Sequence, residues 1–296
     1  MVYVLMALLG LGGVIFTVIR RRKANDKAGL VAVYLVAWGL ISAAEWFAHS
    51  IFNLYRYHTG LSLNTRYDTA WGVLLGEFTF LPSLNVLLVA YFRPWLGALV
   101  GTVIVEAMER IYIPLGLFSY NGWQWWMTPV TFPFYFGACS LYWGLVRRHG
   151  AANPILLPIA RYLGLLGLTT GMSLGVWAFR LSETDLRLVD TTSGNESFSR
   201  IVVHGLGVLL GFWALFPQRW SERWGRIALV TVGQIIVTDA ARAFGLLYFI
   251  RPMSGVLDAA FIGGGTILMG VIQNWIVHHA ALPGERRVPA WEPPKV

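Results

Sequence analysis

Hydrophobic positions along the chain fall into long runs separated by short polar segments, a pattern that predicts membrane-spanning helices. A helix needs about 20 consecutive apolar residues to cross the hydrocarbon core of a bilayer. We expect spans, with boundaries good to a few residues, near 2–19, 28–54, 70–92, 95–116, 127–146, 156–179, 200–216, 225–250 and 255–277. The predicted fold is therefore all-α: a polytopic transmembrane helix bundle of about nine spans.

Composition supports this class. The 296 residues are 56% hydrophobic and only 13% charged, whereas a soluble domain carries roughly 25% charged residues. The first apolar segment has no basic residues before it and no small-residue cleavage site, so we interpret it as a retained span and not as a signal peptide. The net charge is +8, but the basic residues lie in short loops between spans. The expected partner is therefore the lipid bilayer and not a nucleic acid.

The distribution of Lys and Arg predicts the orientation. Alternate loops place 15 basic residues on one side of the membrane and 6 on the other, and Arg110 and Arg242 fall inside spans. Because basic loops stay in the cytoplasm, we expect the N-terminus outside and the C-terminus inside a bacterial cytoplasmic membrane.

Spans two to five resemble spans six to nine. "WGVLLGEFTFLP" at 71–82 parallels "LGVLLGFWALFP" at 206–217, and 103–120 parallels 235–249. Glycine, leucine and valine strings also recur by chance in membrane helices. A true duplication of four spans would give a parallel repeat and place the functional site at the seam. The expected division is a first span with its basic loop (1–27), repeat units at 28–150 and 151–280, and a cytoplasmic tail (281–296).

Few ionisable side chains lie inside the predicted spans. At 1.5 Å per helical residue, all of them fall in the outer half of the bilayer. Because an ion in the bilayer centre is costly, such groups normally face a bundle interior or a watery cavity. The layering predicts a polar chamber, accessible from outside, over an apolar floor; its candidate residues are Glu45, His49, Glu77, Glu106, Glu109, Arg110, His204, Asp239 and Arg242.

Two of these groups of charges have a simpler interpretation. Glu106 precedes Arg110 by four residues, the favourable order for a helical ion pair, and Asp239 precedes Arg242 by three. Each pair also fits a self-neutralised staple between helices. Glu109 has no arginine of its own, which suits proton binding or general-acid chemistry.

The sequence predicts no metal and no cofactor. Glu45 and His49 share a helix face, but no histidine pair has ligand spacing within a span, so a hydrogen bond between them is the simpler interpretation. Cys139 is the single cysteine, and none of the three lysines lies in a span, which leaves no membrane amine for a Schiff base. Nucleophile-elbow, Walker and aspartate-rich motifs are also missing from the sequence.

The segment "FSYNGWQWW" follows the fourth span on the outer side. Asn121-Gly122 is a turn signal, and an interfacial aromatic belt accounts for Trp125 and Trp126. Trp123 follows the turn directly, and we consider it either part of that belt or a lid over the chamber.

Residues 78–136 resemble a family of small multi-pass membrane proteins of spore-forming Firmicutes. The resemblance rests on "FLPSLNVLLVAYF", "VIVEAMER" and "GLFSYNGWQWW" and covers about a fifth of the chain. Family members look like single copies of four or five spans, so the resemblance implies that this chain is a tandem version. Nothing in the second copy matches "YNGWQWW". The family has no assigned activity, so the resemblance implies a fold and a bacterial origin only.

Three functions fit these observations. The leading hypothesis is transport or binding of a small solute or protons. The second is a membrane-embedded enzyme that acts on a lipid or isoprenoid, with Glu109 or Glu45 as general acid and aromatic rings steadying a cation. The third is a non-catalytic subunit of a membrane complex. The sequence does not select a substrate, a coupling ion or an oligomeric state.

Overall fold

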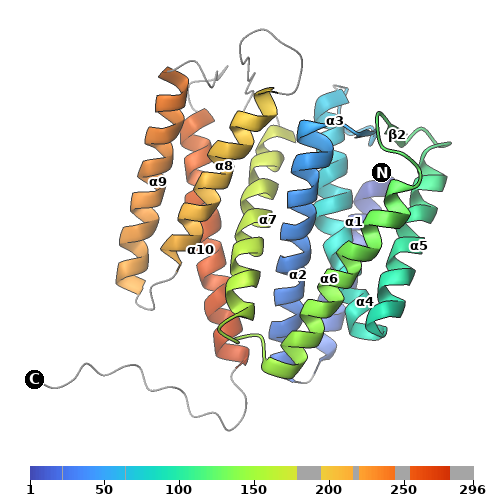
Figure 1. The fold of residues 1–296 in the computed structure, drawn as a ribbon, viewed down its shortest axis with the longest axis horizontal. Coiled ribbons are helices and arrows are strands. Elements are labelled where there is room, and N and C mark those ends of the chain that lie inside the picture. The colour runs from blue at the N-terminus through green and yellow to red at the C-terminus, as the bar shows by residue number, and fades with distance from the viewer. Residues whose placement is uncertain (22, 64, 179–194, 216–219, 244–253, 281–296) are drawn as a thin grey trace, which may run out of the picture.

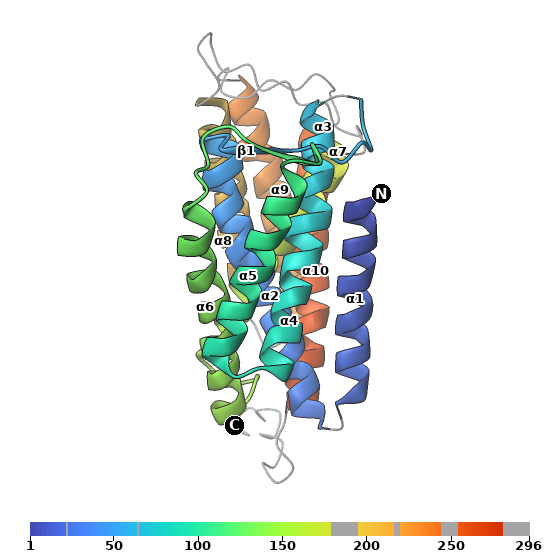
Figure 2. The same ribbon diagram turned by 90° about the vertical axis from the view of Figure 1, so that its right-hand side faces the viewer.

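A computed structural model of the chain describes residues 1–21, 23–63, 65–178, 195–215, 220–243 and 254–280. Its helices run side by side and form an elongated bundle (Figures 1 and 2). The helical elements are α1 (Val2–Arg20), α2 (Ala24–Glu45), η1 (Trp46–Ile51), α3 (Thr65–Gly72), η2 (Val73–Phe80), α4 (Leu81–Tyr91), α5 (Pro94–Tyr112), α6 (Met127–His149), α7 (Leu156–Ala178), α8 (Asn195–Ala214), α9 (Trp220–Ala243) and α10 (Ser254–Ala280).

Each predicted apolar segment is helical over most of its described length; the exceptions are the ends at 52–54, 92, 113–116 and 215. Residues 179, 216 and 244–250, at the ends of three predicted spans, lie outside the described residues. Within the described ranges, three helices are long and apolar enough to cross a membrane: Val2–Arg20, Asn25–Ala48 and Tyr67–Tyr91. Shorter apolar stretches occupy Leu156–Met172, Gly205–Ala214 and Trp224–Ile236. The predicted helical class is therefore confirmed, and the three candidate spans are consistent with a membrane protein.

Two of the long rods contain π-helical turns. The segment η1 continues α2, and η2 joins α3 to α4 in one rod. A π-helical turn takes an extra residue and so shifts the direction of the side chains around it. Glu45 is the last residue before η1, and Glu77 lies inside η2.

A short antiparallel strand pair, which the sequence did not predict, lies across one end of the bundle (Figure 2). Strand β1 (Tyr55–Tyr57) follows η1, and β2 (Phe118–Tyr120) follows α5. Their register pairs Tyr55 with Tyr120 and Tyr57 with Phe118. The pair therefore joins two connections that are more than 60 residues apart in the sequence.

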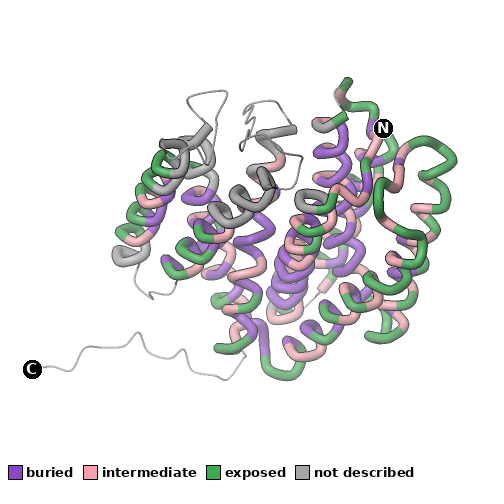
Figure 3. Tube along the Cα trace, turned by 45° about the horizontal axis from the view of Figure 1, so that its top comes forward, coloured by how far each residue is buried: buried purple, intermediate pink, exposed green. Residues whose placement is uncertain are grey.

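Helices α2 and α7 form the buried centre of the bundle, and the outer faces of α5, α6 and α9 are largely exposed (Figure 3). Glycines allow α2 and α7 to approach closely: a Cβ on Gly39 would lie 2.2 Å from the carbonyl oxygen of Leu163, and one on Gly167 would lie 2.7 Å from the Trp38 ring. Small residues at such contacts are typical of helix packing in membranes.

Arg161 lies within the predicted span 156–179, although it counts among the basic residues of the cytoplasmic side. It lies in the second turn of α7, is buried, and donates from Nη1 to the carbonyl oxygen of Leu215 at 3.3 Å. A guanidinium that satisfies the end of a neighbouring helix can be buried where a lysine could not be so well matched.

Replacing Gly39 with alanine should destabilise the bundle, because the new Cβ overlaps the α7 backbone. We expect a loss of about 1–3 kcal/mol, the usual cost of overpacking, measured by reversible unfolding of the purified protein in detergent. Gly144→Ala in α6 is the matched control, since its Cβ would meet no atom within 4 Å. Equal stability of the two variants would contradict the proposed close contact.

Candidate functional site

A cavity of about 440 Å³ lies beneath the strand pair, between α1, α2, η2, α5 and α6. Its walls are mainly apolar and aromatic. Three glutamates from three separate rods face it: Glu45, Glu77 and Glu109. We call this space the acidic cavity. A mainly apolar pocket with a few convergent polar groups is the usual form of a small-molecule site.

Glu45 and Glu77 are buried in the cavity wall. Their residues are 4% and 5% exposed. Glu45 accepts a hydrogen bond from the Tyr55 hydroxyl and Glu77 from the Tyr57 hydroxyl, in both cases through Oε1. The two carboxyl groups are neighbours that interact with each other, and among the described residues each Oε2 atom is buried with no hydrogen-bond partner outside this pair. The arrangement thus holds two neighbouring carboxyl groups in a mainly apolar wall.

Strand β1 positions Tyr55 and Tyr57 at the cavity. Alternate residues of a strand point to the same side, so Tyr55 and Tyr57 both reach the cavity, and Phe118 packs against both rings. A Cβ on Gly72 would lie only 2.1 Å from the Tyr57 Cβ, so the close approach of β1 to α3 requires glycine there. Burial raises the pKa of Tyr57 well above its ordinary value, and the nearby Glu77 and Glu45 raise it further. Tyr57 is therefore a stable proton donor.

Asp68 holds the connection between β1 and α3. Its carboxylate accepts from the backbone N–H groups of Thr59 (2.8 Å), Gly60 (3.2 Å), Leu61 (3.0 Å) and Ser62 (3.2 Å), and from the Thr59 hydroxyl. One buried carboxylate thereby organises a whole turn and fixes where β1 ends.

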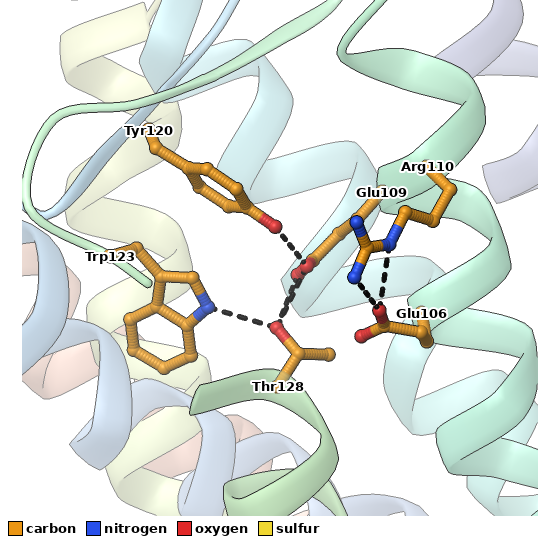
Figure 4. A network of polar contacts seen from close by, with 6 residues as sticks. All are labelled: Glu106, Glu109, Arg110, Tyr120, Trp123 and Thr128. Atoms are coloured by element: carbon orange, nitrogen blue, oxygen red, sulfur yellow. Dashed lines mark hydrogen bonds and ion pairs between the residues drawn. The ribbon is translucent and has the colours of Figure 1, made fainter. Parts of the chain in front are cut away.

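Glu109 lies in a hydrogen-bond chain at the opposite wall (Figure 4). The Tyr120 hydroxyl donates to its Oε2 at 2.9 Å, and the Thr128 hydroxyl lies 2.8 Å from both carboxylate oxygens. Thr128 in turn accepts from the Trp123 indole N–H at 2.9 Å. Burial, followed by the charge of Glu109, raises the pKa of Tyr120, so this hydroxyl also remains a donor.

Trp123 reaches inward from the "NGW" turn. The backbone N–H groups of Asn121, Gly122 and Trp123 all donate to the carbonyl oxygen of Leu54 at 2.8 Å. The Trp123 ring meets Tyr55 edge-to-face at 5.7 Å and lines the cavity. In contrast, the neighbouring Trp125 and Trp126 are 59% and 48% exposed, as an interfacial belt would require.

Glu106 and Arg110 form an ion pair outside the cavity. Arg110 donates to Glu106 Oε1 from Nε at 2.9 Å and from Nη2 at 2.8 Å. The guanidinium also lies over the Trp125 ring, 5.9 Å from its centre. Figure 4 draws the pair beside the Glu109 chain but unconnected to it. The geometry agrees with the simpler interpretation of the sequence, in which Glu106 and Arg110 neutralise each other.

Fewer of the predicted chamber residues line the cavity than expected. Asp239 is exposed on α9, which packs against α8 and α10 and not against the cavity. The side chains of His49, His204 and Arg242 lie outside the described residues. The expected seam between the repeat units is the α2–α7 contact, whereas every residue of the cavity wall precedes residue 136. The prediction of a site at the seam was therefore wrong for this cavity.

Within the described part of the chain, no group of three or more His, Cys, Asp and Glu side chains has the arrangement of a metal site. Sequence reasoning missed Tyr3, Tyr55, Tyr57, Asp68 and Thr128. The Tyr3 hydroxyl donates to the carbonyl oxygen of Leu117 at 2.7 Å and closes the cavity from the side of α1. The triplets "YRY" and "FSY" carried a signal, because aromatic residues alternating with polar ones are typical of strands.

Replacing Trp123 with phenylalanine should lower the free energy of unfolding by about 1–2 kcal/mol, because the variant loses the N–H bond to Thr128 and part of the ring contact. Unfolding of the purified protein followed by circular dichroism measures this change. Trp126→Phe is the control and should stay within about 0.5 kcal/mol of the wild type, as surface substitutions do. A neutral Trp123→Phe would argue against the inward position of the indole.

No protein-family model matches the chain, and neither the curated proteins nor the solved structures contain a match. The function is therefore inferred from the acidic cavity itself.

Proposed function

We propose that this protein binds, and moves across a bacterial cytoplasmic membrane, a small solute or protons at the acidic cavity. The observation that carries the proposal is the convergence of Glu45, Glu77 and Glu109 from separate rods on one largely apolar space. Acidic groups at membrane depth are costly and typically mark ion, proton or substrate pathways.

The Glu45–Glu77 pair favours a proton or a cationic group as the ligand. Each carboxyl group already uses one oxygen for a tyrosine, and its other oxygen has no partner among the described residues apart from the neighbouring carboxyl group. Two adjacent carboxylates repel each other unless a proton or a positive group lies between them. A small solute for this site should therefore combine an apolar body, which suits the aromatic walls, with an amine or another hydrogen-bond donor.

The nine-span topology and the tandem repeat are part of this proposal. Support comes from a recurring pattern of neighbours: α2 packs with α4 and α6, and α4 with α5; correspondingly, α7 packs with α8 and α10, and α8 with α9. The contacts α5–α6 and α9–α10 complete both sets. A parallel duplication is a known plan for transporters. Tyr3 at the cavity end and the basic residues near the other end agree with an outside N-terminus.

Proton uptake should depend on the carboxylate pair. Protein in liposomes that contain a pH-sensitive dye is given an inside-negative potassium diffusion potential, and acidification of the interior is recorded. We expect the double change Glu45→Gln and Glu77→Gln to lower the rate at least about tenfold, equivalent to 1.4 kcal/mol.

Glu106→Gln serves as the control for this experiment, since Glu106 lies outside the cavity and pairs with Arg110. It should leave the rate close to that of the wild type. Equal rates for the double variant and the wild type would refute the proposal. A double variant that loses stability, with no transport activity that can be separated from folding, would favour the role of a non-catalytic subunit.

A membrane-embedded enzyme for a lipid or isoprenoid is the second candidate. It is favoured by the aromatic rings of Tyr55, Phe118 and Phe132 around the cavity, which can stabilise a cation, and by the position of Glu109 beside two hydroxyl donors.

An enzyme must leave a product. Lipid extracts of cells that express the wild type should then contain a species that is missing with Glu109→Gln and present with Glu106→Gln, as measured by mass spectrometry. Identical lipid profiles in all three strains would exclude this candidate.

A further inference from the structure

A second group of polar side chains lies deeper in the bundle than the acidic cavity. Tyr135 of α6 lies beside Asn85 of α4, and Tyr34 of α2 lies beside Ser83 of α4 and near Tyr135. We call these four residues the inner polar cluster. They come from three helices and are uncharged, so a search of the sequence for charged groups did not reveal them.

Tyr135 connects the cluster to the acidic cavity. It belongs to the same cavity wall as Glu77. Asn85 follows Glu77 by eight residues along the η2–α4 rod, which places it about 12 Å farther toward the basic end of the bundle. The cluster therefore continues the polar route inward from the cavity floor.

Asn85 is the residue that requires an explanation. It is fully buried and lies beside the Tyr135 hydroxyl, and among the described residues no hydrogen bond of good geometry satisfies its amide nitrogen or its amide oxygen. Leaving a buried polar group unsatisfied costs about 1–3 kcal/mol. Its neighbour in the sequence, Val86, is equally buried in the apolar core, so an apolar side chain would suit this depth better. An external hydrogen-bonding partner at Asn85 would remove the penalty.

Two hydroxyl groups of the cluster are already anchored. Ser83 donates to the carbonyl oxygen of Thr79 at 2.7 Å, and Tyr135 makes a long bond of 3.3 Å to the carbonyl oxygen of Ala37. A long bond is weak and easily exchanged for another acceptor. The Tyr135 hydroxyl can therefore turn between the Ala37 carbonyl, Asn85 and the cavity.

We propose that the inner polar cluster binds water and relays protons between the acidic cavity and the inner half of the bundle. This inference rests on the proposed function in its proton form. A proton arriving from the Glu77 side binds a lone pair of the Tyr135 oxygen as the proton of that hydroxyl passes to water held by Asn85. Tyr135 is neutral before and after the step, because one proton binds its oxygen for each proton that leaves. Asn85 is a positioning residue that orients the water.

Access of a small aqueous cation tests whether the cluster is hydrated. In a Cys139→Ala background, which removes the only native cysteine, Asn85→Cys is the sole thiol. The full chain in liposomes is exposed to silver ions for graded times and unfolded in detergent, and the remaining thiol is labelled with a fluorescent maleimide. Val86→Cys in the same background is the matched control, because it lies at the same depth in the apolar core.

We expect silver to block Asn85→Cys at least about tenfold faster than Val86→Cys, because ions travel along polar, hydrated routes and avoid apolar packing. Equal rates would overturn the proposal. Thermal unfolding identifies a cysteine variant that fails to fold, and in that case Ser83→Cys replaces Asn85→Cys in the same comparison.

Proton uptake by Asn85→Leu then tests the relay. A residue that only joined helices could be replaced by leucine with no effect on transport, whereas the relay predicts at least a tenfold slower rate, about 1.4 kcal/mol, at unchanged or higher thermal stability. Wild-type uptake in Asn85→Leu would overturn the relay alone. Absence of uptake by the wild type would overturn both the relay and the proton form of the proposed function.

Discussion

The arrangement of this protein depends on the pairing of Tyr55–Tyr57 with Phe118–Tyr120. Carboxyl groups placed in an apolar bundle need hydrogen-bond donors, because burying a charged or polar group without a partner is strongly unfavourable. Helices alone supply few donors at this end, since their side chains there are largely apolar. The strand pair supplies such donors, because the hydroxyl groups of Tyr55 and Tyr57 in β1 donate hydrogen bonds to Glu45 and Glu77.

The rods are adapted to the same constraint. The π-helical segments adjoin or contain the two glutamates that meet the strand pair, and a local change in helical winding is a common way to direct a side chain into a functional space. At the other side of the cavity, Thr128 and Trp123 extend the donor chain to Glu109. Asp68 fixes the end of β1 through the turn at 59–62. The strand pair, its anchors and the helical irregularities thus form one hydrogen-bonded cap.

Hydrophobic periodicity and the positions of charged residues predicted the helices and the three cavity glutamates, because both can be read from neighbouring residues in the sequence. The strand pair joins short segments that are distant in the sequence, and only the spacing of "YRY" and "FSY" hinted at it. Asp239 was expected among the cavity residues because depth was inferred along one helix axis, which carries no information about the direction in which a side chain faces. The site was expected at the seam between the repeat units for the same reason, because depth along a helix does not show which neighbouring helices a side chain faces. Whether the remaining helices also cross the membrane stays a prediction.

The contrast between Glu106 and Glu109 indicates what the cavity selects for. Both lie on α5, less than one turn apart, and both were candidates for the chamber. Arg110 neutralises Glu106 within the same helix, so that carboxylate has little remaining affinity for another cation. Glu109 instead receives neutral hydroxyl donors, as do Glu45 and Glu77. Hydroxyl groups orient a carboxyl group without cancelling its charge, and they can release it when a proton or a cation arrives. A site built only to join helices would gain more from arginine partners, so hydroxyl partners at all three cavity glutamates favour reversible binding over a fixed structural role.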